Sequence, residues 1–247
     1  MGIETDTRLR AEGVTVQKGG RTLVRDVGIS VVAGEVLGVL GPSGAGKSTF
    51  FGALVGEETL SSGKVWLDGH DVSPLTLWQR ARLGLGYIPQ SPSVLWDLSV
   101  RDNLSTFLRV ARVAKLQPRS RDAVADAAER VGLERLLDVK AGALSGGERR
   151  RLELGRALTA APRVLICDEP FAGVDPRGAA AVGELLQSLA RTGVAVVLAD
   201  HHVDEALHIC TRALLLLDGA VALSADPAAF REDPLVRGRY LGTWTAD

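Results

Sequence analysis

The sequence has 247 residues, of which 46% are hydrophobic and 24% are charged, and its formal net charge is −1. This length and composition predict a soluble globular chain of one large domain with a sizeable buried core. The near-zero net charge argues against an electrostatic nucleic-acid surface, so we expect no nucleic-acid partner.

The apolar stretches are short. Each falls below the roughly eighteen residues of a membrane-spanning helix, and the N-terminus lacks the basic region and apolar core of a secretion signal. Cys167 and Cys210 lie in apolar stretches without metal-ligand spacing, which predicts buried thiols in a reducing compartment. We therefore expect a cytoplasmic chain that contacts a membrane only through partner subunits.

The N-terminal part is rich in strand patterns and predicts an antiparallel β subdomain. These patterns occupy residues 9–16, 22–32, 36–40, 65–67 and 85–88. Gly19 and Gly20 predict a turn between the first two. Val36–Leu40 is a continuous apolar run, as in strands covered on both faces, and a helix should start near Gly46.

A helical segment follows and then a strand–helix alternation. Residues 99–160 have helical periodicity with breaks at Pro118 and Gly132. The alternation consists of strands at 164–167, 194–199 and 213–217 and helices at 176–192 and 203–209. Such alternation predicts βαβ crossovers and a mostly parallel sheet, hence an α/β fold. We expect a single domain over residues 8–242, with a helical subdomain inserted at about 91–160.

A phosphate-binding loop joins the strand Val36–Leu40 to the following helix. It consists of Gly41, Pro42, Ser43, Gly44, Ala45, Gly46, Lys47 and Ser48, and Thr49 continues into the helix. Its glycines allow backbone N–H groups to hold phosphate oxygens at a helix N-terminus. Lys47 should reach the β- and γ-phosphates, and Ser48 should bind Mg²⁺. The alternative is a glycine-rich turn with a capping serine. That alternative does not explain why Lys47 and Ser48 follow the glycines at this spacing.

Two carboxylates end the apolar strand at 164–167. Asp168 and Glu169 lie where an open α/β sheet places its ligand. We expect Asp168 to hold hydrated Mg²⁺ and Glu169 to polarise the attacking water as a general base. The alternative is a surface turn before Pro170, which the phosphate loop makes less favourable.

A second glycine pair opens the helix that precedes these carboxylates. Ser145, Gly146, Gly147 and Glu148 would form an anion site at a helix N-terminus. Ser145 and Glu148 also have the spacing of a capping box, and the two roles are compatible. Glycines are costly at a helix start, which favours a phosphate-binding purpose.

Together with the phosphate loop and the paired carboxylates, this run resembles the signature sequence of ATP-binding-cassette (ABC) ATPases. The matches extend from about residue 9 to residue 242. The resemblance implies a P-loop fold, ATP and Mg²⁺ as substrate and cofactor, and hydrolysis by two cassettes closed head to tail. In this arrangement each signature run contacts the ATP of the other copy, so we expect a homodimer.

The resemblance also implies roles for four further residues. His201 would contact the γ-phosphate and link it to Glu169, the alternative being an exposed loop histidine. Gln90 would reach Mg²⁺ and the attacking water, and Asp175 would be shared across the dimer interface. Lys18 stands where the family usually stacks an aromatic residue on adenine, which predicts weaker and less base-selective binding.

Three stretches narrow the resemblance to one group of transporters. The signature run continues into Glu148-Arg149-Arg150-Arg151, as in the ATPases of lipopolysaccharide exporters. The runs 168–176 and 236–242 also resemble the corresponding stretches of these lipopolysaccharide-export ATPases. The ATPases of branched-chain amino-acid importers, which end similarly, are the first alternative. A soluble single-cassette ATPase of the iron–sulfur assembly type is the second.

The transporter prediction requires two transmembrane permease subunits, to which the chain would bind on the cytoplasmic face of the inner membrane. Val94, Leu95 and Trp96 are apolar residues just after Gln90, where a helix of a membrane subunit would dock. Exposed apolar groups there would be unfavourable in a chain that works alone. The alternative is that Leu95 and Trp96 pack the helical subdomain.

Overall fold

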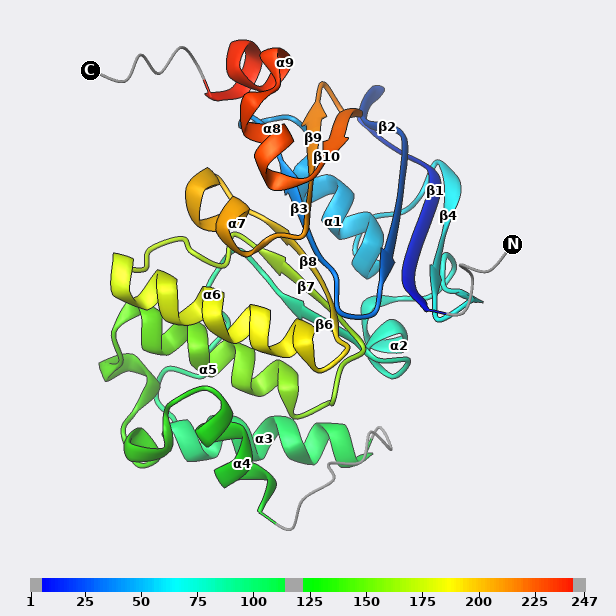
Figure 1. Ribbon diagram of the computed structural model, residues 1–247. Helices are drawn as coiled ribbons and strands as arrows, with labels where there is room; N and C mark the ends of the chain where they lie inside the picture. The colour runs from blue at the N-terminus through cyan, green and yellow to red at the C-terminus, as the bar shows by residue number, and fades with distance from the viewer. Residues whose placement is uncertain (1–5, 114–121, 242–247) are drawn as a thin grey trace, which may run out of the picture.

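The computed structural model describes residues 6–113 and 122–241 (Figure 1). The predicted break at Pro118 and the predicted domain end at residue 242 lie outside these residues. The described residues form two β-sheets and a helical subdomain. No described helix is both long and apolar enough to span a membrane.

The N-terminal sheet is antiparallel, as predicted. Its strands are β1 (Thr7–Lys18), β2 (Arg21–Val32), β4 (Ser62–Leu67) and β5 (His70–Asp71), in the order β2-β1-β4-β5. The turn between β1 and β2 is made by Gly19 and Gly20, which both have positive φ. Alternate residues of β1 and β2 are buried in a core that they share with α1 and the central strands, so this sheet covers one side of the core.

The central sheet is mostly parallel, which confirms the predicted α/β class. Its strands are β3 (Val36–Leu40), β6 (Leu85–Ile88), β7 (Val164–Asp168), β8 (Ala195–Ala199), β9 (Arg212–Leu217) and β10 (Ala220–Ala225). They are ordered β10-β9-β3-β8-β7-β6, and β10 is antiparallel to β9. β3, β7 and β8 are buried along their whole length, because helices or the N-terminal sheet cover both faces.

The helices cover the central sheet and form a separate lobe (Figure 1). They are α1 (Lys47–Val55), α2 (Leu77–Ala81), α3 (Val100–Val113), α4 (Ala123–Arg130), α5 (Gly146–Leu158), α6 (Pro176–Arg191), α7 (Val203–Ile209), α8 (Pro227–Glu232) and α9 (Pro234–Val236). Short helical turns occupy Glu134–Leu136, Ala141–Ala143 and Arg237–Leu241. In Figure 1, α5 lies beside α6 and connects the sheet to α3 and α4.

The lobe shares one apolar core with the helices beside the sheet. Leu104 of α3, Val131 after α4 and Leu152 of α5 are buried in it. Gly155 allows α5 to approach closely, since a Cβ there would lie 3.2 Å from Leu104 and from Val131. This shared core fixes the start of α5 relative to the ends of the central strands, where the predicted site lies.

Candidate active site

The phosphate loop turns sharply between β3 and α1. Gly41, Gly44 and Gly46 have φ angles of 155°, 78° and 100°. A Cβ on Gly41 would lie 2.2 Å from the carbonyl oxygen of Leu216, and one on Gly46 would lie 2.5 Å from that of Leu23. Glycine is therefore required at both positions by left-handed backbone and by close approach of neighbouring strands.

Lys47 is held by its own loop. Its Nζ donates to the carbonyl oxygens of Gly41 at 2.6 Å and Pro42 at 3.0 Å. Burial lowers the pKa of Lys47, and the carboxylates of Glu169, Asp168 and Asp200 oppose that shift. The ammonium group thus stands at the mouth of the loop, facing carboxylates at the ends of two strands.

Asp168 and Ser48 offer oxygen ligands suited to Mg²⁺. Asp168 is 4% exposed, and burial raises the pKa of its carboxyl group. The Ser48 hydroxyl donates to this carboxylate and, together with Lys47, partly offsets the shift. A carboxylate and a hydroxyl beside a phosphate loop fit the hard-ligand preference of Mg²⁺. The residues present therefore fit the cofactor that the sequence predicted.

Glu169 has an unusual backbone. Its φ is 51°, and its N–H donates to the carbonyl oxygen of Ala199 at 2.7 Å. A left-handed conformation is costly for a residue with a side chain, so the surrounding contacts must impose it. The bond to Ala199 thus holds Glu169 at the junction of β7 and β8.

The two adjacent histidines have different partners. His201 Nδ1 lies 3.4 Å from Glu169 Oε2. His202 Nδ1 instead lies 2.8 Å from Asp200 Oδ1. The structure therefore places the predicted pair of Glu169 and His201 together.

Arg150 is a buried arginine whose importance the sequence did not reveal. Its guanidinium donates to the carbonyl oxygens of Asp168, Glu169 and Pro170 and to that of Pro89. It also forms an ion pair of 2.7 Å with Glu153, which is buried one turn further along α5. Glu153 in turn accepts from the Ser93 N–H. Through Arg150, helix α5 thus fixes the backbone at Pro89 on one side of the candidate site and at Asp168–Pro170 on the other.

The start of α5 is capped as the sequence predicted. Ser145 Oγ accepts from the Glu148 N–H at 3.3 Å, and Glu148 Oε2 accepts from the Ser145 N–H at 2.8 Å. These bonds to Ser145 lower the pKa of Glu148. The capping box thus satisfies two backbone N–H groups at the start of the helix, those of Ser145 and Glu148.

Gly146 and Gly147 have a packing purpose that the sequence argument missed. A Cβ on Gly146 would lie 2.3 Å from the Gly173 carbonyl oxygen, and one on Gly147 would lie 3.0 Å from Gly178 Cα. The start of α5 therefore packs on the backbone before and within α6. The cost of glycine at this helix start is offset by close packing, so it is no longer evidence for phosphate binding alone.

The remaining predicted residues lie around this centre. Asp175 caps α6 by accepting from the N–H groups of Arg177 and Gly178, both at 3.1 Å. Gln90 is exposed after β6, and Thr49 is half-buried in the first turn of α1. Lys18 forms a 2.6 Å ion pair with Glu58, a partner 40 residues away.

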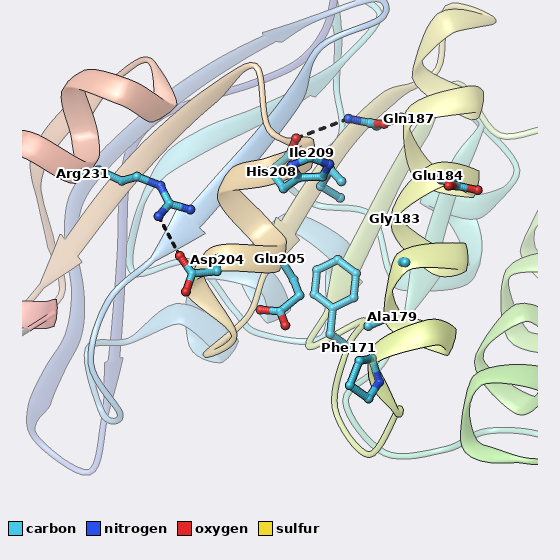
Figure 2. Close-up of a pocket in the computed structure, with 12 residues that line it drawn as sticks. Phe171, Ala179, Gly183, Glu184, Gln187, Asp204, Glu205, His208, Ile209 and Arg231 are labelled. Atoms are coloured by element: carbon cyan, nitrogen blue, oxygen red, sulfur yellow. Dashed lines mark hydrogen bonds and ion pairs between the residues drawn. The ribbon is translucent and has the colours of Figure 1, made fainter. Parts of the chain in front are cut away.

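A hollow of about 490 Å³ lies between α6 and α7. Figure 2 shows Phe171 at its base and the ion pair of Arg231 with Asp204 at one side. The N–H of Phe171 donates to Asp200 Oδ2 at 2.9 Å. The wall of this hollow is therefore bonded directly to the residue that precedes His201.

Comparison with known proteins identifies the family. A family model described as "ABC transporter" matches residues 24–172. The chain is 41% identical to the lipopolysaccharide export system ATP-binding protein LptB of Acidithiobacillus ferridurans, over 95% of this chain and 96% of the relative. It is 40% identical to a probable ABC transporter ATP-binding protein of Azorhizobium caulinodans, over 95% of this chain and 83% of the relative.

A solved structure has the same fold. The crystal structure of the ADP conformation of MJ1267, an ATP-binding cassette of an ABC transporter, matches with a TM-score of 0.85 and 26% identity. The match covers 96% of this chain and 99% of that chain. The sequence match and the shared fold agree with the geometry of the phosphate loop and the paired carboxylates. The chain therefore belongs to the ABC transporter ATPase family and is the ATP-hydrolysing subunit of a transporter.

Proposed function

We propose that two copies of this chain power the export of lipopolysaccharide through two transmembrane subunits. The main support for this proposal is the 41% identity to a lipopolysaccharide export ATPase over nearly the whole length of both chains. The run Glu148-Arg149-Arg150-Arg151 after the signature glycines supports the same group. The chain would then lie on the cytoplasmic face of the inner membrane, attached through its partners.

The proposed hydrolysis assigns one role to each group of the candidate site. Lys47 and the loop N–H groups hold the phosphates of ATP, and Glu169 takes a proton from the attacking water. His201, next to Glu169, contacts the γ-phosphate, and Ser145, Gly146 and Gly147 of the other copy contact it from the opposite side. Asp175 crosses the same interface. Ser48, Asp168 and Gln90 would hold Mg²⁺, which would neutralise charge on the phosphates.

The proposed docking surface for the membrane subunits consists of Leu95 and Trp96. These side chains are 37% and 48% exposed. Val94, which the sequence analysis placed in the same surface, is buried in the core and is removed from it. The Trp96 ring lies 5.3 Å from the Arg149 guanidinium carbon, and its carbonyl accepts from the Gly142 N–H at 3.0 Å. Trp96 is therefore held beside the signature helix, where docking can affect the ATP site.

Replacing Trp96 with alanine should reduce assembly with the membrane subunits by at least about tenfold. A buried tryptophan at an interface commonly contributes 2 kcal/mol or more, roughly. Co-purification from detergent extracts measures the effect. Trp78→Ala is the control, because this tryptophan on α2 is 60% exposed. Equal loss in both variants, or no loss in Trp96→Ala, contradicts the docking surface.

The transported molecule is tested by exchange of partners. The chain is co-expressed with the membrane subunits of a lipopolysaccharide exporter and, separately, with those of a branched-chain amino-acid importer. We expect a stable complex and ATP-dependent extraction of lipopolysaccharide only with the exporter. Assembly with the importer subunits favours the first alternative. Failure to associate with any membrane protein in its own cells favours a soluble ATPase of the iron–sulfur assembly type.

Lys18 should weaken discrimination between nucleotide bases. Its ammonium group is bound to Glu58, so only its alkyl stem is left to pack on a base, and a stem is less rigid than an aromatic ring. We expect Lys18→Tyr to bind ATP several-fold more tightly and to prefer ATP over GTP more strongly. Titration of both nucleotides measures this, with Lys64→Tyr on β4 as control. Unchanged affinity and selectivity in Lys18→Tyr contradict the prediction.

A further inference from the structure

The residues around His201 form a cluster of potential metal ligands distinct from the expected magnesium site. Among the described residues, ligand atoms of Asp200, His201 and His202 all lie within 4.8 Å of one another. Glu169 lies beside this group, with its Oε2 3.4 Å from His201 Nδ1. The cluster thus offers two imidazole nitrogens and one carboxylate oxygen.

The spacing of these atoms is close to that of a tetrahedral zinc site. Zinc bonds of about 2.0–2.1 Å to nitrogen and oxygen place the ligand atoms of a tetrahedron roughly 3.4 Å apart. In the structure, His201 Nδ1 lies 3.7 Å from Asp200 Oδ1. His202 Nδ1 lies 2.8 Å from Asp200 Oδ1. Small side-chain rotations therefore suffice to place these three atoms around an ion, with water as the fourth ligand.

The two histidines of the cluster are accessible to solvent, and its carboxylate is buried and hydrogen-bonded. The side chains of His201 and His202 are 58% and 37% exposed, and their rings lie 4.1 Å apart. Asp200 is fully buried, and its second oxygen, Oδ2, accepts from the Phe171 N–H at 2.9 Å. An ion can therefore enter from solvent while the bond to Phe171 holds the Asp200 carboxylate in place.

We propose that Asp200, His201 and His202 bind one Zn²⁺ per chain and that this ion inhibits ATP hydrolysis. Two imidazoles select zinc over Mg²⁺, which prefers oxygen ligands alone. Binding breaks the contact of 2.8 Å between His202 Nδ1 and Asp200 Oδ1 and draws His201 away from Glu169. The proposed hydrolysis needs His201 beside Glu169, so zinc binding and turnover exclude each other.

The cysteines do not compete for the ion. Cys167 and Cys210 are buried, and desolvation raises the pKa of each thiol to about 12. Zinc binds the thiolate form, which is scarce at neutral pH when the pKa is so high. His202 is the informative ligand, because it contacts Asp200 and has no part in the proposed hydrolysis.

Titration of the untagged full-length protein with Zn²⁺, without nucleotide or Mg²⁺, tests the site. Calorimetry should show one ion per chain, and Co²⁺ in its place should give the absorption of a tetrahedral complex without thiolate bands. His202→Asn and His201→Asn should each weaken binding by at least about tenfold. His208→Asn, which alters an exposed histidine of α7 outside the cluster, should bind as the wild type does.

Inhibition is measured at buffered free Zn²⁺, with each rate expressed relative to the same protein without zinc. We expect His202→Asn to need at least about tenfold more Zn²⁺ for half-inhibition than wild type or His208→Asn. Absence of binding to the wild type, or equal binding by wild type and His202→Asn, overturns the site. Binding without inhibition overturns the regulatory part. Neither result depends on which molecule the transporter moves.

Discussion

Replacing Glu169 with glutamine should reduce ATP turnover by about 10²–10⁴-fold, the contribution typical of a general base. The amide keeps the shape of the side chain but cannot accept the proton. The left-handed backbone and the bond to Ala199 are unaffected by this change. ATP should therefore still bind and draw two copies together, so the variant should accumulate as an ATP-bound dimer.

Turnover is measured by phosphate release, and dimer formation by light scattering with and without ATP and Mg²⁺. Glu184→Gln, which changes an exposed carboxylate of α6, is the control and should hydrolyse ATP at the wild-type rate. Substantial turnover by Glu169→Gln would show that another group is the base. Loss of ATP binding would show that Glu169 has a structural role instead.

Replacing Arg150 with methionine should lower the free energy of unfolding by about 3–5 kcal/mol, since it leaves Glu153 buried without its ion-pair partner. The same change frees four carbonyl oxygens, three of them in the Asp168–Pro170 segment. A second loss should therefore appear in catalysis. We expect lower turnover even where the protein is fully folded, because the strained backbone of Glu169 loses its support.

Urea unfolding measures the first effect, and ATP hydrolysis well below the unfolding midpoint measures the second. Arg151→Met is the matched control, because this neighbour on α5 is half-buried and donates to the single carbonyl of Val131. Glu153→Gln tests the ion pair and retains a partner for Ser93. Equal effects of the Arg150 and Arg151 changes would contradict the assigned role of Arg150.

The sequence was sufficient where chemistry depends on adjacent residues. The phosphate loop, the Asp168–Glu169 pair and the capping box of Ser145 follow from spacing along one strand end or helix start. The order of the long strands and helices also followed, because their apolar patterns are continuous. Short elements were missed: α2 has five residues, and β10 alternates weakly since much of it is exposed. The Asp226-Pro227 start of α8 was a readable capping signal.

Contacts between distant residues could not be predicted in the same way. Three consecutive arginines look alike in the sequence, and only the orientation of α5 buries Arg150. The sequence suggests a role for Lys18 at the base, but it gives no sign that Glu58, 40 residues away, is its ion-pair partner. Similarly, the glycines of the signature run are explained by Gly173 and Gly178, which only the packing of α5 on α6 reveals.

The bonds of Lys47 to its own loop have a consequence for product release. The carbonyl oxygens of Gly41 and Pro42 satisfy the ammonium group within the chain. Departure of a product phosphate therefore need not leave an unpaired buried cation, which is costly in free energy.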